Sequence, residues 1–214
     1  MRSDVSAVLF DEPLTVIDPH LKWQLRRKLK EIHQELNLTL IYVTHDQTEA
    51  LTFAEEVVVM SRGKAVQIGT PEALFERPAH TFVGHFIGSP GMNFLQAKWE
   101  SGVLTVGSYQ LRDGASGMAF NALPMASLAD AGSVRLGVRP EYLYPCEPNA
   151  PGAVPARISR VQDLGTYLLL SCDFEGGQLR ARARAGSEAA VDDTVWLPLL
   201  NSHTCFYRDE ELIS

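Results

Sequence analysis

The sequence is short of the features that mark several classes of protein. Its 214 residues include three cysteines, Cys146, Cys172 and Cys205, which are widely spaced and form no CxxC pair. They predict free thiols in a reducing compartment rather than a disulfide framework or a zinc site. No apolar run approaches the roughly 20 residues that a membrane-spanning helix needs, and the chain opens without a signal-peptide pattern. We therefore expect a soluble, cytoplasmic protein.

Clustered basic residues are also missing, and the formal net charge is −7. Binding to a nucleic-acid backbone depends on clustered Lys and Arg, so we expect no nucleic-acid partner. What the chain does have is an ordinary apolar fraction of 45%, which is enough for a packed core. Its length fits one large domain or two small ones.

Residues 1–87 alternate between strand-like and helix-like segments. β-Branched and apolar runs predict strands over residues 7–10 and 38–44 and a hairpin from 57–60 and 65–68; apolar spacing and capping residues predict helices over 19–36, 47–55, 71–77 and 79–87. Asp18 before Pro19 is a typical helix start, and Asp46 with Glu49 predicts a capping box. This alternation predicts an α/β layer with a largely parallel sheet.

Beyond residue 87 the character of the sequence changes. The turn-rich segment GSPG lies within a predicted linker, residues 88–93, and residues 94–214 form a second predicted domain. Short β-like runs follow at 94–99, 103–106, 134–138, 156–161, 167–172, 178–183 and 195–199. Their spacing favours a small β-barrel or sandwich.

The stretch VLFDEPLTVIDPH places two adjacent carboxylates, Asp11 and Glu12, at the end of the first strand, and His45 ends the next strand. The helix between them has the length of a crossover connection, so these strands should be parallel neighbours whose carboxyl ends share one edge. Such a constellation suits magnesium-dependent hydrolysis. By spacing alone, ordinary turn chemistry explains these residues equally well.

Four blocks of the sequence carry a resemblance to a known family. FDEPLTVID resembles the Walker B and D-loop segment of ATP-binding-cassette (ABC) ATPases, and IYVTHDQTEAL resembles their switch-histidine segment. In carbohydrate-type importers the ATPase domain is followed by an extra C-terminal domain. The junction to that domain is resembled by GTPEALFERPAHTFVGHFIGSPGMNF, and a motif within it by LGVRPE. The resemblance implies a partial P-loop NTPase (ABC) α/β domain followed by an all-β, OB-like barrel of the TOBE/MOP type.

The same resemblance implies roles for individual residues. Asp11 would be the Walker B aspartate near magnesium, and Glu12 the general base that polarises the attacking water. Asp18 would be the D-loop aspartate at the subunit interface beside the nucleotide, and His45 the switch histidine near the γ-phosphate. The implied cofactors are ATP and Mg²⁺. Thr15 and Val16 stand where Ser and Asn are usual, which puts communication through this loop in doubt.

Half of such an active site is missing from the sequence. It contains no GxxxxGK[ST] phosphate loop and no LSGGQ signature, and RGKA at residues 62–65 lacks the first glycine and the hydroxyl of a phosphate loop. In the family both motifs precede Walker B. Because carboxylates repel a nucleotide and cannot replace backbone N–H donors and a lysine, we expect this chain alone not to hydrolyse ATP.

The resemblance also implies partners and a place in the cell. The implied partners are a homodimeric or paired ATPase subunit, permease subunits in the membrane and, indirectly, an external solute-binding protein. The implied place is peripheral, on the inner face of the bacterial cell membrane. TVIDPHLKW resembles the subgroup that takes up glycerol or related polyols. We further expect residues 1–87 to expose apolar surface and to self-associate or stay partly mobile, and residues 94–214 to dimerise through apolar contacts.

Two other hypotheses remain open from the sequence. One is a non-catalytic module for dimerisation or for sensing small anions. Similar domains of molybdate-type importers bind oxyanions, and Arg180, Arg182 and Arg184 alternate with alanines along one predicted strand face. That face could equally be a solvated one. The other hypothesis is a magnesium-dependent hydrolase of a different family.

Overall fold

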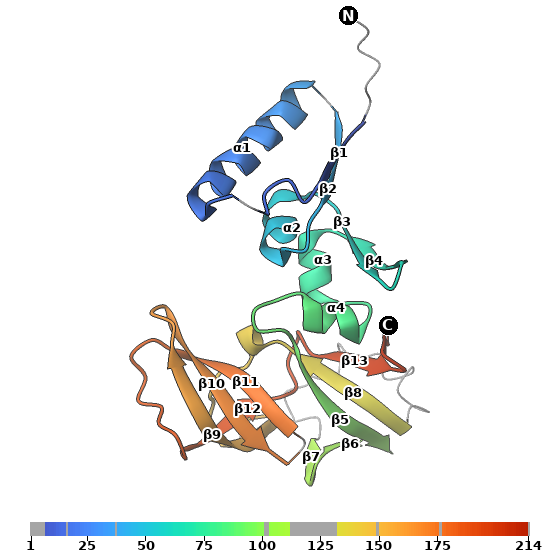
Figure 1. Cartoon of the computed structure of the whole chain (residues 1–214). Helices are drawn as coiled ribbons and strands as arrows, with labels where there is room; N and C mark the ends of the chain where they lie inside the picture. Colours follow the sequence, from blue (N-terminus) through green and yellow to red (C-terminus); the bar gives the residue numbers. More distant parts are fainter. Residues whose placement is uncertain are drawn as a thin grey trace, which may run out of the picture. The chain divides into compact units, whose positions relative to one another are not determined.

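The computed structural model (Figure 1) describes residues 7–15, 17–36, 38–100, 103–111, 132–148, 150–175 and 177–213. The expectation made for Val16 lies outside these ranges. The chain divides into two compact units, Met1–Val58 with Ile68–Pro71, and Val59–Gln67 with Glu72–Ser214. In the described residues, none of the helices is long and apolar enough to cross a membrane.

The first unit contains β1 (Ala7–Asp11), α1 (Pro19–Leu36), β2 (Thr39–Val43) and α2 (Gln47–Phe53). β1 and β2 pair in parallel, with Asp11 opposite Val43, as the crossover length predicts. Asp18 Oδ1 accepts a hydrogen bond from the His20 amide at 2.9 Å at the start of α1. Both strands and both helices therefore lie within two residues of their predicted bounds.

Much of the apolar surface of this unit is exposed to solvent. Leu9, Leu21, Trp23, Ile41 and Val43 are between 44% and 64% exposed. Trp23 lies 5.9 Å from the Arg27 guanidinium and is 60% exposed. In the part of the chain that the structure describes, this unit therefore exposes apolar surface, as expected.

The boundary between the units falls within the hairpin of β3 (Val57–Ser61) and β4 (Lys64–Gly69). Two short helices follow, α3 (Pro71–Glu76) and α4 (Thr81–Phe86). The structure groups residues 72–87 with the β-strands that follow, so the division between the compact units does not coincide with the predicted linker at residues 88–93. As a boundary between sequence domains, that linker stays a prediction.

Two antiparallel sheets make up the rest of the second unit. One has the strand order β11-β10-β9-β12 and the other β14-β13-β8-β5-β6-β7. Their bounds are β5 (Asn93–Glu100), β6 (Val103–Val106), β7 (Tyr109–Leu111), β8 (Gly132–Val138), β9 (Ala153–Asp163), β10 (Tyr167–Phe174), β11 (Gly177–Arg184), β12 (Thr194–Pro198), β13 (Cys205–Arg208) and β14 (Glu211–Leu212), with a 3₁₀ turn η1 (Pro140–Tyr142) after β8. All seven predicted strands are confirmed, and β7, β13 and β14 are additional.

The two sheets share one hydrophobic core, and alternation along the strands explains it. Leu168, Leu170 and Cys172 of β10 are buried, as are Leu179, Ala181 and Ala183 of β11, whereas their neighbours in sequence face outward. All three cysteines are free, as predicted. Burial raises the pKa of the Cys172 thiol to about 11.

Arg139, in the LGVRPE motif, fastens the two short helices to this β-part. Its side chain is 1% exposed and donates hydrogen bonds to the carbonyl oxygens of Phe75 at 2.5 Å and Ile87 at 2.6 Å. The guanidinium also lies 3.9 Å from the centre of the Phe75 ring. These carbonyls close α3 and α4, so one buried cation satisfies acceptors that both helix ends leave open.

The GSPG segment is closely packed and is not an open linker. A Cβ atom at Gly91 would lie 2.3 Å from the His85 carbonyl oxygen, and the Met92 amide donates to the Gly84 carbonyl at 2.9 Å. Only glycine allows an approach this close. This packing argues against the free bending that a turn-rich linker suggests.

Candidate functional site

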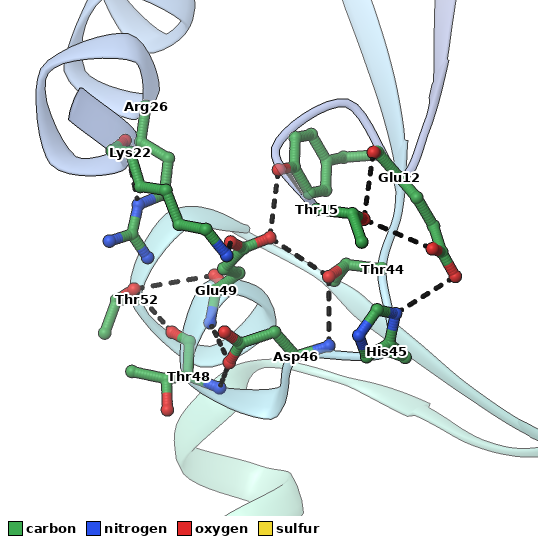
Figure 2. A network of polar contacts seen from close by, with 11 residues as sticks. Glu12, Thr15, Lys22, Arg26, Thr44, His45, Asp46, Thr48, Glu49 and Thr52 are labelled. Atoms are coloured by element: carbon green, nitrogen blue, oxygen red, sulfur yellow. Dashed lines mark hydrogen bonds and ion pairs between the residues drawn. The ribbon is translucent and has the colours of Figure 1, made fainter. Parts of the chain in front are cut away.

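The carboxyl ends of β1 and β2 bring Glu12 and His45 together (Figure 2). His45 Nδ1 lies 3.1 Å from Glu12 Oε1, and the Glu12 amide donates to the Val43 carbonyl at 2.9 Å. Both side chains are open to solvent, with Glu12 44% and His45 68% exposed. The expectation that parallel strands place these two residues at one edge agrees with this geometry; their catalytic roles stay a prediction.

Glu12 has an unusual backbone for a non-glycine residue, with φ at 45°. Such left-handed positions store strain and concentrate at functional sites. The Thr15 hydroxyl lies 3.1 Å from the Glu12 carbonyl and 3.2 Å from Glu12 Oε2, so it can donate to either oxygen. Hydrogen bonding to His45, and then to Thr15, holds the pKa of the Glu12 carboxyl below its ordinary value. The carboxylate is therefore ionised at neutral pH and can accept a proton or orient a water molecule.

A buried carboxylate behind this edge holds the histidine loop in place. Glu49 is 4% exposed; it accepts hydrogen bonds from Tyr42 and Thr44, each at 3.0 Å, and pairs with Lys22 at 3.3 Å. The Thr44 hydroxyl in turn accepts from the Asp46 amide at 3.0 Å. Because His45 lies between Thr44 and Asp46, this network orients the loop that carries it (Figure 2).

The predicted capping box is confirmed in one direction only. Asp46 Oδ1 accepts from the amides of Thr48 at 2.8 Å and Glu49 at 3.3 Å, which makes it the N-cap of α2. The reciprocal bond is replaced, because Thr44 takes the Asp46 amide and the Glu49 carboxylate turns toward Tyr42, Thr44 and Lys22. The three-residue spacing of Asp46 and Glu49 predicts the cap but does not reveal partners on β2 and α1.

The remaining predicted site residues are Asp11 and Asp18; among the described residues, neither side chain forms a hydrogen bond or ion pair with Glu12 or His45. Asp11 is exposed at the last position of β1, and Asp18 caps α1. Among the residues that the structure describes, no group of three or more His, Cys, Asp or Glu side chains is placed to hold a metal ion.

The chemistry of this edge fits magnesium in part and does not fit the phosphates of ATP. Asp11 and Glu12 offer the oxygen ligands that Mg²⁺ prefers, and such sites keep several waters. Phosphates instead need N–H donors and positive charge, whereas this edge offers two carboxylates, and the sequence holds no phosphate loop. This edge therefore offers oxygen ligands but no set of phosphate donors, and its role as half of a hydrolytic site stays a prediction.

Comparison with known proteins first defines the class. Residues 136–205 match the family model "TOBE domain", which confirms the predicted OB-like, TOBE-type β-domain. Among solved structures, a cytoplasmic molybdate-binding protein ModG with molybdate bound aligns at a TM-score of 0.37 and 12% identity, over 53% of this chain and 94% of that one. The partial P-loop NTPase character of residues 1–87 stays a prediction.

Relatives then identify the kind of protein to which the chain is related. It is 37% identical over 194 residues to the uncharacterized ABC transporter ATP-binding protein y4oS of Sinorhizobium fredii, covering 91% of this chain and 50% of the relative. It is 43% identical over 168 residues to the sn-glycerol-3-phosphate import ATP-binding protein UgpC of Ruegeria pomeroyi, covering 78% and 44%. With the oligosaccharides import ATP-binding protein MsmX of Bacillus subtilis it shares 35% over 210 residues, covering 94% and 56%.

These similarities confirm the resemblance that the motifs carry. The chain is similar to the import ATP-binding proteins for sn-glycerol-3-phosphate and for oligosaccharides, and its residues 136–205 match the TOBE domain. It spans about half the length of the curated relatives that it matches.

Proposed function

We propose that the chain is the C-terminal portion of the ATP-hydrolysing subunit of an ABC importer that energises uptake of a sugar, polyol or glycerol-type solute. The observation that carries this proposal is the Glu12–His45 pair, 3.1 Å apart at the ends of two parallel strands. An ionised carboxylate held by a histidine on an exposed sheet edge suits a residue that activates water. The relatives, whose names describe import ATP-binding proteins, support the same role.

Within this proposal each site residue has a distinct task. Glu12 takes the proton of an attacking water, and His45 holds the Glu12 carboxylate and faces the position of the terminal phosphate. Asp11 is the carboxylate for Mg²⁺, and Asp18 belongs to the interface with a second ATPase subunit. Residues 1–87 are then the C-terminal part of a P-loop NTPase domain. ATP binding requires a phosphate loop and a signature motif, neither of which is in this sequence.

The proposal includes the partners and the location that such a subunit has. These are a second ATPase subunit, membrane-spanning permease subunits and, through them, an external solute-binding protein, with the chain peripheral on the cytoplasmic face of the bacterial membrane. The exposed apolar side chains of the first unit, such as Leu9 and Ile41, support contact with further protein.

The test uses two proteins and a matched control. The 214-residue chain alone, supplied with Mg²⁺ and ATP, should show no turnover above background. In a protein that joins this chain to a phosphate loop and signature motif, Glu12→Gln should abolish hydrolysis and keep ATP binding, because the base is lost while the carboxylate at Asp11 stays. His45→Ala should also reduce turnover strongly.

Glu31→Gln is the control, since Glu31 is an exposed α1 residue whose ion pairs in the described part of the chain are with Lys28 at 3.1 Å and Arg27 at 3.3 Å. It should leave turnover unchanged. Turnover by the isolated chain that Glu12→Gln removes, or full turnover of the joined Glu12→Gln protein, would overturn the proposal.

A further inference from the structure

Glu49 is a charged side chain placed where charge is costly. It is 4% exposed, and both of its carboxylate oxygens have partners. Oε2 accepts from the hydroxyls of Tyr42 and Thr44, each at 3.0 Å, and Oε1 lies 3.3 Å from Lys22 Nζ (Figure 2). Burial, and then the hydrogen bond to Glu49, raises the pKa of Tyr42 above its ordinary value, so this hydroxyl keeps the proton that it donates. The carboxylate is thus held by donors from β2, from the loop after β2 and from α1.

Stability is a weak explanation for the Lys22–Glu49 pair. Replacing a buried ion pair by apolar side chains of similar volume is often neutral or stabilising, because the desolvation penalty disappears. A buried pair can instead specify geometry, since it is satisfied only when its partners stand at particular positions. Here the partners belong to α1 and α2, two helices that begin next to the predicted site residues.

On the α2 side, Glu49 holds the histidine loop. The Thr44 hydroxyl donates to Glu49 Oε2 at 3.0 Å and accepts from the Asp46 amide, also at 3.0 Å. One hydroxyl therefore holds the residues on both sides of His45. The His45 ring is 68% exposed and lies 3.1 Å from Glu12 Oε1. Because packing restrains so exposed a ring little, its distance from Glu12 depends on the backbone that Glu49 holds.

On the α1 side, Lys22 belongs to the first turn of the helix. The Lys22 amide donates to the Asp18 carbonyl at 2.9 Å, and Asp18 Oδ1 accepts from the His20 amide at 2.9 Å. Lys22 therefore lies one hydrogen-bonded turn beyond the capping aspartate. Its side chain, which is 21% exposed, reaches from this turn to Glu49. The ion pair is thus one turn away from the residue predicted to meet a second subunit.

Two contacts consequently join the same two segments of the chain. One segment is residues 12–22, and the other is the loop between β2 and α2 with the first turn of α2. Glu12 and His45 join them at the exposed edge, and Lys22 and Glu49 join them again in the interior. Two separate contacts fix the relative position of two segments better than one exposed contact does, because each removes freedom that the other leaves.

We propose that Lys22 and Glu49 are positioning residues for hydrolysis. They hold His45 within reach of Glu12 and link it to the turn of α1 that Asp18 begins. Both act through the backbone of the histidine loop and not by contact with water or phosphate. This inference rests on the proposed function. Because Asp18 is proposed to meet a second ATPase subunit, the same link lets that contact act on His45.

The kinetic test uses the protein that joins this chain to a phosphate loop and signature motif. Glu49→Gln keeps the shape of the side chain but places an amide beside the Lys22 ammonium, and Lys22→Met removes the ammonium. Each should lower kcat by about tenfold to a hundredfold, the effect of a displacement of about 1 Å, and leave KM for ATP within about twofold. Lys22→Arg keeps the charge and should lose less than about threefold.

Matched controls lie on the same helix. Lys28→Met and Glu31→Gln make the same two chemical changes in an exposed pair whose charged atoms are 3.1 Å apart. Because exposed pairs contribute little and this one holds no loop, each control should change kcat by less than about twofold.

The double variant Lys22→Met, Glu49→Gln separates positioning from stability. Lys22→Met alone leaves a buried carboxylate without its cation and should lower the urea midpoint of unfolding. The double variant should recover most of that loss, because neither charge remains. A purely structural role predicts that turnover recovers with stability. Positioning predicts that kcat stays at least about tenfold low, because the link to α1 is absent.

A second measurement needs no ATP and uses the 214-residue chain with isotope-labelled histidine. Glu12→Gln should shift the nuclear magnetic resonances of the His45 ring, because the ring loses its carboxylate partner. In a Glu49→Gln background the same substitution should produce a clearly smaller shift, since the ring is no longer held beside Glu12. Shifts of equal size in the two backgrounds would contradict the proposal.

Three kinetic results would also overturn it: a kcat of Glu49→Gln within about twofold of the unaltered protein, equal losses in Lys28→Met and Lys22→Met, or recovery of turnover in the double variant. The two proposals fail in different ways. If Glu12→Gln leaves hydrolysis intact, the proposed function fails, and the ring shifts still show whether Glu49 holds His45. If Glu12→Gln abolishes hydrolysis and Glu49→Gln leaves it intact, this inference alone fails.

Discussion

Replacing Arg139 by methionine tests whether one buried cation joins α3 and α4 to the β-sheets. Methionine fills similar space but leaves the carbonyl oxygens of Phe75 and Ile87 without their donors at 2.5 and 2.6 Å. Hydrogen bonds from a charged donor contribute about 1.5–3 kcal/mol each. Removing a buried charge offsets part of that loss, because its desolvation penalty disappears. We expect a net destabilisation of about 3 kcal/mol, a large share of a typical domain's stability.

Urea unfolding followed by tryptophan fluorescence measures this effect. A Trp23→Phe background confines the fluorescence to Trp99 and Trp196, both in the second unit. With a urea dependence of about 2 kcal/mol per molar, the midpoint should fall by about 1.5 M. Hydrogen exchange should show protection lost first at the Ile87 amide, which bonds to the Val83 carbonyl at 2.8 Å.

Two further variants make the measurement specific. Arg135→Met removes an arginine that is 41% exposed and only 3.6 Å from Glu210; it should change stability by less than about 0.5 kcal/mol. Arg139→Lys keeps the charge but cannot reach several carbonyls at once, so its loss should be intermediate. If Arg139→Met lowers the unfolding free energy by less than about 1 kcal/mol, or no more than Arg135→Met does, the reasoning is refuted.

Three other predictions follow from the same structure. Burial alone would raise the pKa of Glu76, but hydrogen bonds from Tyr142 and His203 outweigh it and lower this pKa; the resulting stability is present above the ordinary value of 4.5 and is lost as pH falls through the folded pKa. Glu76→Gln should therefore flatten the acid side of a plot of urea midpoint against pH, and unchanged slopes would contradict this. Because burial raises the pKa of the Cys172 thiol to about 11 and also raises that of Cys205, a thiol reagent at about pH 8 should label both slowly in the native chain and all three cysteines rapidly in urea; rapid native labelling of three thiols would count against it. The exposed Leu9, Ile41 and Val43 predict that the chain self-associates in sedimentation experiments, with little weakening by salt because the contact is apolar, and that Ile41→Asp reduces it; a strict monomer at high micromolar concentration would remove this idea.

Some features could be predicted because they depend on neighbours in the sequence. Asp18 caps α1, and Asp46 caps α2, because short polar side chains compete well for the first amides of a helix. Alternating apolar residues define the strands from β8 to β12. The meeting of Glu12 and His45 also follows from local information, since a crossover helix of this length leaves two parallel strands with their carboxyl ends together.

The partners of buried polar groups could not be predicted in this way. Arg139 bonds to carbonyls 64 and 52 positions away, and Glu49 takes Lys22 and Tyr42, which precede it by 27 and 7 residues. Arg182 pairs with Glu141, whereas in the described residues neither Arg160 nor Arg180 pairs with a carboxylate. This difference depends on a turn and a β-bulge. Periodicity in the sequence shows which face a side chain takes, because that is set by the local backbone. Which group meets it there is decided only when distant segments pack, since a buried charge or amide must be satisfied by whatever the tertiary structure brings within hydrogen-bond distance.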